Sequence, residues 1–178
     1  MRELMNIIRS RRSTRAFQPG KLPPREQIEQ LVEAAQWAAQ WAPSGMGKQL
    51  WHFTVLYNAD KSIELARAVS TATDRGPDYN FYHAPVQIIV SYERDERHAF
   101  LDGSAAMENI LLMAENLGLG SCWINQIRDC CDEPEVRKLL TSYGIPSSHI
   151  VIASAAIGYI AKETPAKSRK QGTVTFVE

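Results

Sequence analysis

The sequence has no excess charge of either sign and no long apolar run. Its 20 Lys and Arg residues balance its 20 Asp and Glu residues, so no overall field draws the chain toward nucleic acid or a membrane surface. The N-terminal residues MRELMNIIRSRR interrupt their apolar side chains with charge every few positions, which excludes a signal-peptide core and a transmembrane run there. We therefore expect no nucleic-acid partner, no membrane partner and a cytoplasmic location.

Cysteine and histidine are scarce, with three and four residues respectively. The odd number of cysteines and the adjacency of Cys130 and Cys131 exclude a disulfide framework and a spaced metal site. The histidines lie far apart in the sequence and show no paired spacing of the kind that binds zinc. We expect reduced thiols, including Cys122, and no metal.

What the chain contains is a globular composition, with 44% hydrophobic and 22% charged residues, and this excludes a disordered or collagen-like chain. A length of 178 residues suits one domain that spans residues 1–178. No internal repeat or low-complexity stretch divides it.

Periodicity and capping residues predict helices over residues 4–8, 23–42, 60–70, 98–117 and 133–144. Strands are predicted over residues 51–57, 83–92, 121–125 and 149–159 and at the end of the tail, 167–177. Asp60 is the expected cap of the third helix, and Gly118 and Gly144 are expected to end the last two. Residues 71–80 show no periodicity and are interpreted as a mobile linker. The order predicts an α+β fold, in which helices pack on a sheet without doubly wound alternation.

The basic segment RRSTR, from Arg11 to Arg15, follows the end of the first predicted helix. Three guanidinium groups and two hydroxyls could hold a dianionic phosphate through charge-assisted hydrogen bonds, each worth about 1.5 to 3 kcal/mol. A solvated basic surface is the simpler alternative. A second cluster in the tail, Lys167, Ser168 and Arg169, favours a shared anion site, because the chain has no excess of positive charge that would produce such clusters.

Two glycine-containing stretches have different meanings. Residues 43–49, PSGMGKQ, form an exposed loop whose backbone could approach a flat ligand, although an ordinary helix-to-strand turn is the alternative. Gly118 and Gly120 end a helix instead of opening one after a strand, so they do not form a dinucleotide-binding fingerprint.

These segments together resemble the nitroreductase superfamily of FMN-dependent homodimers. The similar stretches occur in the family's order and are IIRSRRSTRAF, PSGMGKQLWHF, HAPVQIIV, DGSAAMENILLMAENLGLGSCWI, and AIGY followed by AKSRKQGTVTFV. The resemblance implies a nitroreductase-like fold, with a mixed, mostly antiparallel sheet flanked by helices in an intertwined homodimer. It also implies that the long helix near 98–117, with small residues at 103–106, lies at the dimer interface and that FMN occupies clefts shared by both subunits.

The resemblance assigns two groups of residues to the cofactor. The contacts to the phosphate and to the polar edge of the ring system are expected from Arg11, Arg12, Ser13, Arg15, Lys167 and Arg169. The other expected contacts are a loop that reaches the flavin from the second subunit (Pro43, Ser44, Gly45), a polar contact to the pyrimidine end (Asn80), and backbone laid against the flavin (Trp123, Ile124, Asn125). For Trp123, packing as a core aromatic is the alternative to ring contact.

In members of this family, FMN accepts a hydride from NADH or NADPH and passes reducing equivalents to a nitroaromatic, a quinone or a similar small acceptor. The cofactor supplies that chemistry, so we expect no catalytic side chain and expect solvent to supply the proton. This chain departs from many members in having Gly47 for asparagine, Leu50 for proline, and Asn125 with Gln126 for glutamate and glycine. Two alternatives stay open: a reductase or dehydrogenase of a specific metabolite with ferredoxin or flavodoxin as donor, and a non-catalytic FMN-binding protein.

Overall fold

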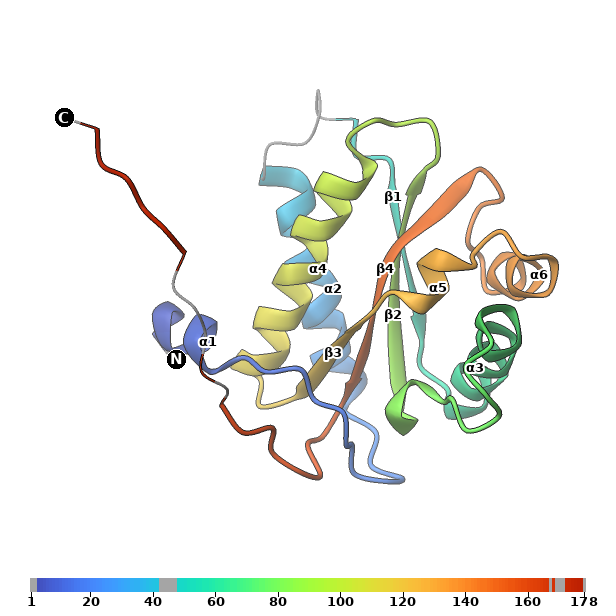
Figure 1. The fold of residues 1–178 in the computed structure, drawn as a ribbon, viewed down its shortest axis with the longest axis horizontal. Coiled ribbons are helices and arrows are strands. Elements are labelled where there is room, and N and C mark those ends of the chain that lie inside the picture. The colour runs from blue at the N-terminus through green and yellow to red at the C-terminus, as the bar shows by residue number, and fades with distance from the viewer. Residues whose placement is uncertain (1–2, 42–47, 167, 169–171, 178) are drawn as a thin grey trace.

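The structure, a computed structural model, describes residues 3–41, 48–166, 168 and 172–177, without the side chains of residues 39–41. The elements run in the following order (Figure 1): α1 (Leu4–Ser10), α2 (Arg25–Trp41), β1 (Trp51–Leu56), α3 (Ala59–Thr73), η2 (Phe81–His83), β2 (Val86–Glu93), α4 (Ala99–Asn116), β3 (Gly120–Ile124), α5 (Gln126–Asp129), α6 (Pro134–Ser142) and β4 (His149–Gly158). Within the described ranges, no helix is both long and apolar enough to cross a membrane.

The four strands form one sheet in the order β1-β2-β4-β3, and each neighbouring pair is antiparallel. The parallel component among the described residues is an isolated bridge between Ser13 and Ser121. Strand β2 lies at the centre, and its first seven residues are buried, as the nearly continuous apolar run predicted. The α+β class with a mostly antiparallel sheet is therefore confirmed.

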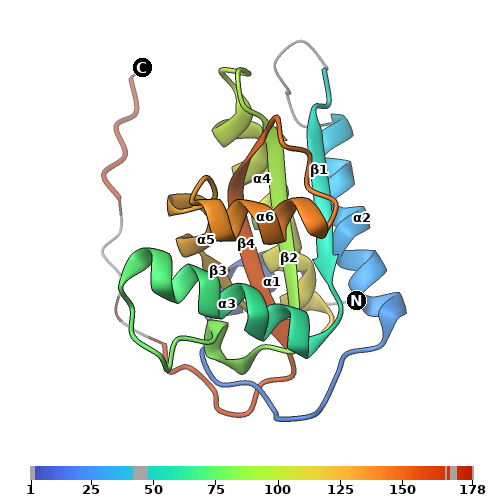
Figure 2. The same cartoon turned by 90° about the vertical axis from the view of Figure 1, so that its right-hand side faces the viewer.

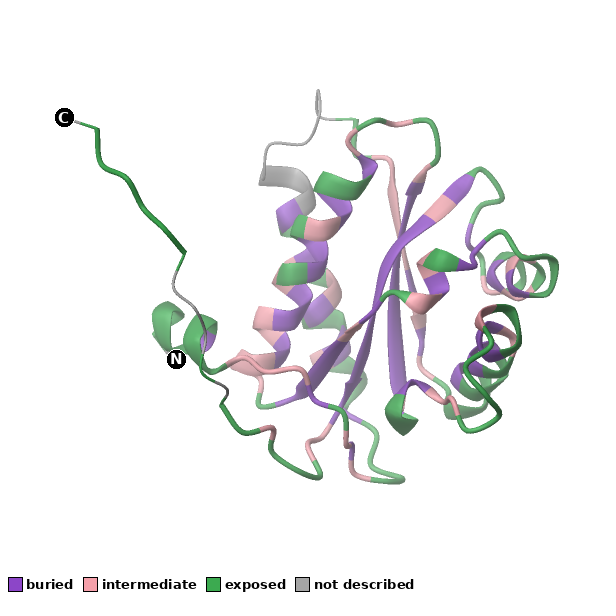
Figure 3. Ribbon diagram, viewed as in Figure 1, coloured by how far each residue is buried: buried purple, intermediate pink, exposed green. Residues whose placement is uncertain are grey.

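Helices cover both faces of the sheet. Helices α2 and α4 pack on one face, and α3, α5 and α6 lie over the other (Figures 1 and 2). Residues on β2 alternate between two cores: Val86, Ile88 and Val90 join the α2/α4 side, and Ile89 joins the α3/α5/α6 side. The buried surface follows the strands and the inward sides of the helices (Figure 3). Strand β3 is an edge strand of the sheet.

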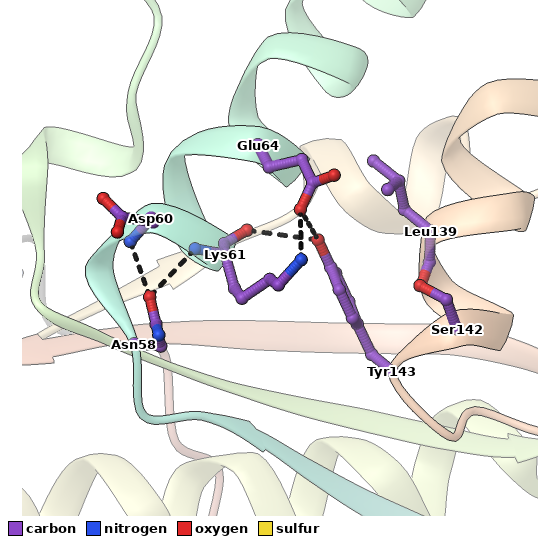
Figure 4. Close-up of polar contacts among 7 residues, drawn as sticks. All are labelled: Asn58, Asp60, Lys61, Glu64, Leu139, Ser142 and Tyr143. Carbon is purple, nitrogen blue, oxygen red and sulfur yellow. Dashed lines mark hydrogen bonds and ion pairs between the residues drawn. The ribbon is translucent and has the colours of Figure 1, made fainter.

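Helix α3 corrects two predictions. Its N-cap is Asn58, whose side chain accepts hydrogen bonds from the backbone N–H of Asp60 and of Lys61 (Figure 4), so Asp60 lies in the first turn instead of capping it. The helix also continues to Thr73, into the segment interpreted as a linker. Helix α3 shares an apolar core with α6, and a polar contact lies at the C-cap of α6: the Tyr143 hydroxyl lies 2.9 Å from Glu64 Oε2, which also accepts from Lys61 Nζ at 2.9 Å.

Helix α4 packs closely on the sheet at Gly103. A Cβ atom there would lie 2.7 Å from Ile152 Cγ2 on β4, well inside an ordinary contact distance. The small residue at position 103 is thus required by the sheet within one subunit. It is not available to a subunit interface, whereas the neighbouring Ala105 is exposed.

The end of the chain differs from the predicted strand. Residues 172–177 form no strand in this chain, and Val174, Phe176 and Val177 are 75%, 87% and 93% exposed. Alternating apolar residues favour a strand only when a neighbouring strand supplies the hydrogen bonds. The prediction is therefore wrong for the single chain.

Candidate functional site

The basic segment lies along the edge strand β3. The backbone N–H of Thr14 donates to the Ser121 carbonyl at 2.8 Å, and Ser13 forms a bridge with the same residue. Gly120 makes this close approach possible, because a Cβ there would lie 2.7 Å from Thr14 Cγ2 and 2.9 Å from Ile160 Cγ1. The sequence after the first helix is therefore positioned by a backbone bridge to β3 and not merely exposed on the surface.

The three arginines of this segment differ in their partners. Arg12 Nη1 is used within the turn, where it donates to the carbonyls of Arg9 and Arg11 at 2.6 and 2.9 Å. Arg11 makes a long contact of 3.6 Å with Glu108 of α4. Arg15 has no carboxylate partner among the described residues, and its guanidinium lies 6.0 Å from the centroid of the Tyr82 ring. Arg15 therefore offers the least compensated positive charge.

The cysteines are buried thiols without disulfide bonds. Burial raises the pKa of Cys122, and the nearby Arg15 and Arg11 guanidinium groups act in the opposite direction. Burial also raises the pKa of Cys130 to about 11. Because a thiolate is the reactive form, neither thiol is activated.

Asn80 begins a short turn with unusual backbone geometry. Phe81, Tyr82 and His83 all have left-handed φ angles, 51°, 62° and 55°, which bulky residues seldom adopt. The Asn80 carboxamide holds this turn: its oxygen accepts from the His83 backbone N–H at 3.0 Å, and its nitrogen donates to the Asp78 carbonyl at 2.7 Å. The side-chain oxygen of Asn80 has a second lone pair, which can accept one further hydrogen bond.

The end of β3 brings together an indole and a carboxamide. Trp123 is half-buried against the core on the α2/α4 side, and its Nε1–H donates to Asn125 Oδ1 at 2.7 Å. Ile124 points into the opposite core and is 2% exposed, so only its backbone is available to a ligand. Asn125 is exposed.

The structure thus places most of the predicted site residues along one sheet edge. Arg11, Ser13 and Arg15 lie beside β3, whose far end carries the Trp123–Asn125 pair. The turn at Asn80 is joined to this edge through two contacts, the Arg15–Tyr82 approach and a 3.0 Å hydrogen bond from the Tyr79 hydroxyl to Gln126 Oε1. Arg12 and Ile124 lie in the same two segments, and five predicted residues lie outside the described part of the chain; they are Pro43, Ser44, Gly45, Lys167 and Arg169, and Gly47 lies there as well.

Sequence reasoning missed the residues that position this edge. Gly120 was considered only as part of a failed dinucleotide motif, although a glycine inside a strand often marks close backbone approach. Thr164 was not singled out, and its hydroxyl donates to the Ser13 carbonyl at 3.1 Å. Tyr82 carried no signal, because the left-handed turn that presents it has no glycine.

The chain is similar to known proteins over most of its length. A crystal structure of a nitroreductase with bound FMN from Bacteroides fragilis superposes with a TM-score of 0.87, at 38% identity and with 100% of both chains covered. A relative in Methanothermobacter thermautotrophicus, whose name includes the words NADH dehydrogenase/NAD(P)H nitroreductase, is 31% identical over 90% of this chain and 78% of its own length. A 4-nitrobenzoate reductase of a Nocardioides species is 26% identical over 91% of this chain and 82% of its own. Because the family model named Nitroreductase family also matches residues 8–159, the chain belongs to the nitroreductase family.

Proposed function

We propose that the chain is an FMN-dependent oxidoreductase and that the basic segment beside β3 binds the FMN phosphate. The observation that carries this proposal is the pairing of Thr14 with Ser121. It puts Arg15, which has no carboxylate partner among the described residues, on the sheet edge that ends in Trp123 and Asn125. The FMN bound by the similar B. fragilis nitroreductase supports the same cofactor here.

The donor groups on this edge fit the chemistry of FMN. Arg11 and Arg15 supply charge for the phosphate, and the Ser13 hydroxyl adds a neutral donor. Trp123 offers an aromatic surface and Asn125 a carboxamide for the ring. Asn80 keeps a lone pair that could accept from an N–H group at the pyrimidine end. The proposed contacts of Arg12, Ile124, Pro43, Ser44, Gly45, Lys167 and Arg169 stay predictions.

When bound, FMN supplies the hydride chemistry, and the chain supplies binding, orientation and electrostatics. We propose NADH or NADPH as the donor and a nitroaromatic, a quinone or a similar small molecule as the acceptor. The names of the archaeal relative and of the 4-nitrobenzoate reductase support this pair. Cationic and amide donors around the ring would stabilise the charge that it gains on reduction, so no side chain of this edge has to act as an acid.

We further propose a homodimer. Helix α1 exposes Leu4, Met5 and Ile8, which are 64%, 46% and 47% exposed. Beside them, a mostly apolar groove of about 500 Å³ runs between α1, α2 and α4, with Leu112 and Met113 in its wall. A second copy of the chain would cover this surface, and sedimentation equilibrium at micromolar concentration should give twice the chain mass.

The experiment that tests the function is the visible spectrum of the freshly purified protein. The protein should be yellow or take up FMN, and anaerobic NADH or NADPH should bleach the flavin absorbance. A quinone or nitroaromatic should restore it. A protein that stays colourless after incubation with FMN would refute the proposal. Reduction by dithionite but by neither nicotinamide would indicate a different donor, and bleaching without reoxidation by any acceptor would indicate a binding protein.

A further inference from the structure

The Asn125 carboxamide does not cap the helix that follows it. Asn125 is the N-cap residue of α5, yet its side chain makes no capping hydrogen bond. Asparagine is favoured at N-caps because its side-chain oxygen accepts from the first backbone N–H groups of the helix. Here that oxygen accepts instead from the indole N–H of Trp123, at 2.7 Å.

This contact defines how the carboxamide is turned. The indole nitrogen can only donate, so the atom facing it must be the Asn125 oxygen and not the nitrogen. The Nδ2 group, with its two N–H donors, therefore points away from the indole, and it has no hydrogen-bond partner among the described residues. Trp123 in turn is held by packing against the core on the α2/α4 side. Trp123 therefore fixes the orientation of the exposed Asn125 Nδ2 group, which can donate hydrogen bonds to a ligand.

The donor lies on the same strand edge as the basic segment. Ser121, which binds Thr14, and Asn125 are four residues apart, or about 13 Å along an extended chain. A flavin whose phosphate lies near Arg15 and whose ribityl chain follows this edge would bring its ring toward Asn125.

We propose that Trp123 is a positioning residue that turns the Asn125 carboxamide so that its N–H groups donate to the edge of the bound flavin ring. This inference rests on the proposed FMN function. The donated hydrogen bond strengthens as the ring gains negative charge on reduction, so it stabilises reduced FMN more than oxidised FMN and raises the midpoint potential of the cofactor. A carboxylate at position 125 would do the opposite.

The test is the midpoint potential of FMN in the holoenzyme, measured by anaerobic spectroelectrochemistry on wild-type protein and four variants. Asn125→Asp keeps the shape and the indole contact but replaces the donor with a charge. It should weaken binding of reduced relative to oxidised FMN about tenfold, which lowers the two-electron potential by about 30 mV. Asn125→Ala removes the donor without adding charge and should lower the potential less. Trp123→Phe keeps an aromatic ring but loses the indole donor, and should also lower it.

Asn58→Asp is the matched control, because it adds the same charge at the start of α3, where aspartate also caps a helix; it should leave the potential unchanged. The proposal is overturned if Asn125→Asp behaves like Asn58→Asp, or if Asn125→Ala leaves the potential unchanged, since charge alone would then explain the aspartate. An unchanged potential in Trp123→Phe would overturn the positioning role. A wild-type protein that takes up no FMN would instead refute the proposed function.

Discussion

Replacing Gly120 with alanine tests whether the close approach of the basic segment to β3 matters for the cofactor. The new Cβ would lie 2.7 Å from Thr14 Cγ2 and 2.8 Å from Thr14 Oγ1, whereas ordinary carbon contacts lie at about 3.5 to 4.0 Å. These contacts must therefore open by about 1 Å. Because the Thr14 side chain is buried and β-branched, we expect the segment to move outward. Overpacking of this kind costs about 1 to 3 kcal/mol of unfolding free energy.

The same movement should weaken FMN binding. Loss of one charge-assisted hydrogen bond to the phosphate, worth about 1.5 to 3 kcal/mol, corresponds to an increase in Kd of about 10- to 100-fold. Quenching of FMN fluorescence on titration measures this Kd, and urea unfolding measures the stability. Gly144→Ala is the matched control. The φ of 91° at this position strains an alanine, but no atom lies close enough to clash with its Cβ. The free energy of unfolding should therefore fall by about 1 to 3 kcal/mol, and the affinity for FMN should stay unchanged.

Adding Thr14→Ala to Gly120→Ala removes the two nearest clashing atoms and should restore part of the affinity. Ile160 Cγ1, at 2.9 Å from the new Cβ, keeps the rescue incomplete. If Gly120→Ala binds FMN as tightly as the wild type, the reasoning about this edge is wrong. A loss of affinity that Thr14→Ala leaves fully in place would also contradict it.

Three further predictions concern stability. Hydrogen bonds from Arg94 and Arg137 hold the pKa of Asp132 at about 2, below its ordinary 3.8. The stabilisation from the ionised Asp132 is therefore present above pH 3.8 and lost as the pH falls toward 2. In Asp132→Asn, the free energy of unfolding in urea should change less steeply with pH across that range. Burial lowers the pKa of His149 below 6.5, so stability should fall as the pH drops below 6.5, and His149→Gln should remove that step or the assignment is wrong. Tyr143→Phe removes the hydroxyl beside Glu64 that joins α6 to α3 and should lower Tm slightly, whereas an unchanged Tm would show that this exposed contact contributes nothing measurable.

The local sequence was sufficient where one physical requirement dominated. The apolar run of β2 can only be a central strand, and Gly118 and Gly144, with φ angles of 71° and 91°, end their helices because the left-handed conformation favours glycine. The cap of α3 was misassigned because asparagine and aspartate are both good caps. The choice between Asn58 and Asp60 depends on the residue at which β1 ends, which the local sequence does not define.

Other features depend on contacts that a single sequence does not contain. The alternation in residues 172–177 is typical of a strand, but no strand among the described residues pairs with it. Helix α5 spans four residues, too few for a periodic pattern. The RRSTR motif suggested an anion site, but two features emerged only from three-dimensional geometry: the use of Arg12 Nη1 within the turn, and the lack of a carboxylate partner for Arg15 in the described part of the chain.

The central claim is that the basic segment beside β3 holds the phosphate of FMN. The most direct measurement compares the dissociation constants of FMN and riboflavin for the wild type and for Arg15→Ala, since riboflavin lacks only the phosphate. We predict that the substitution weakens FMN at least about tenfold, as the loss of one charge-assisted hydrogen bond implies, and changes riboflavin little. Equal losses for the two ligands would place Arg15 away from the phosphate and contradict the claim.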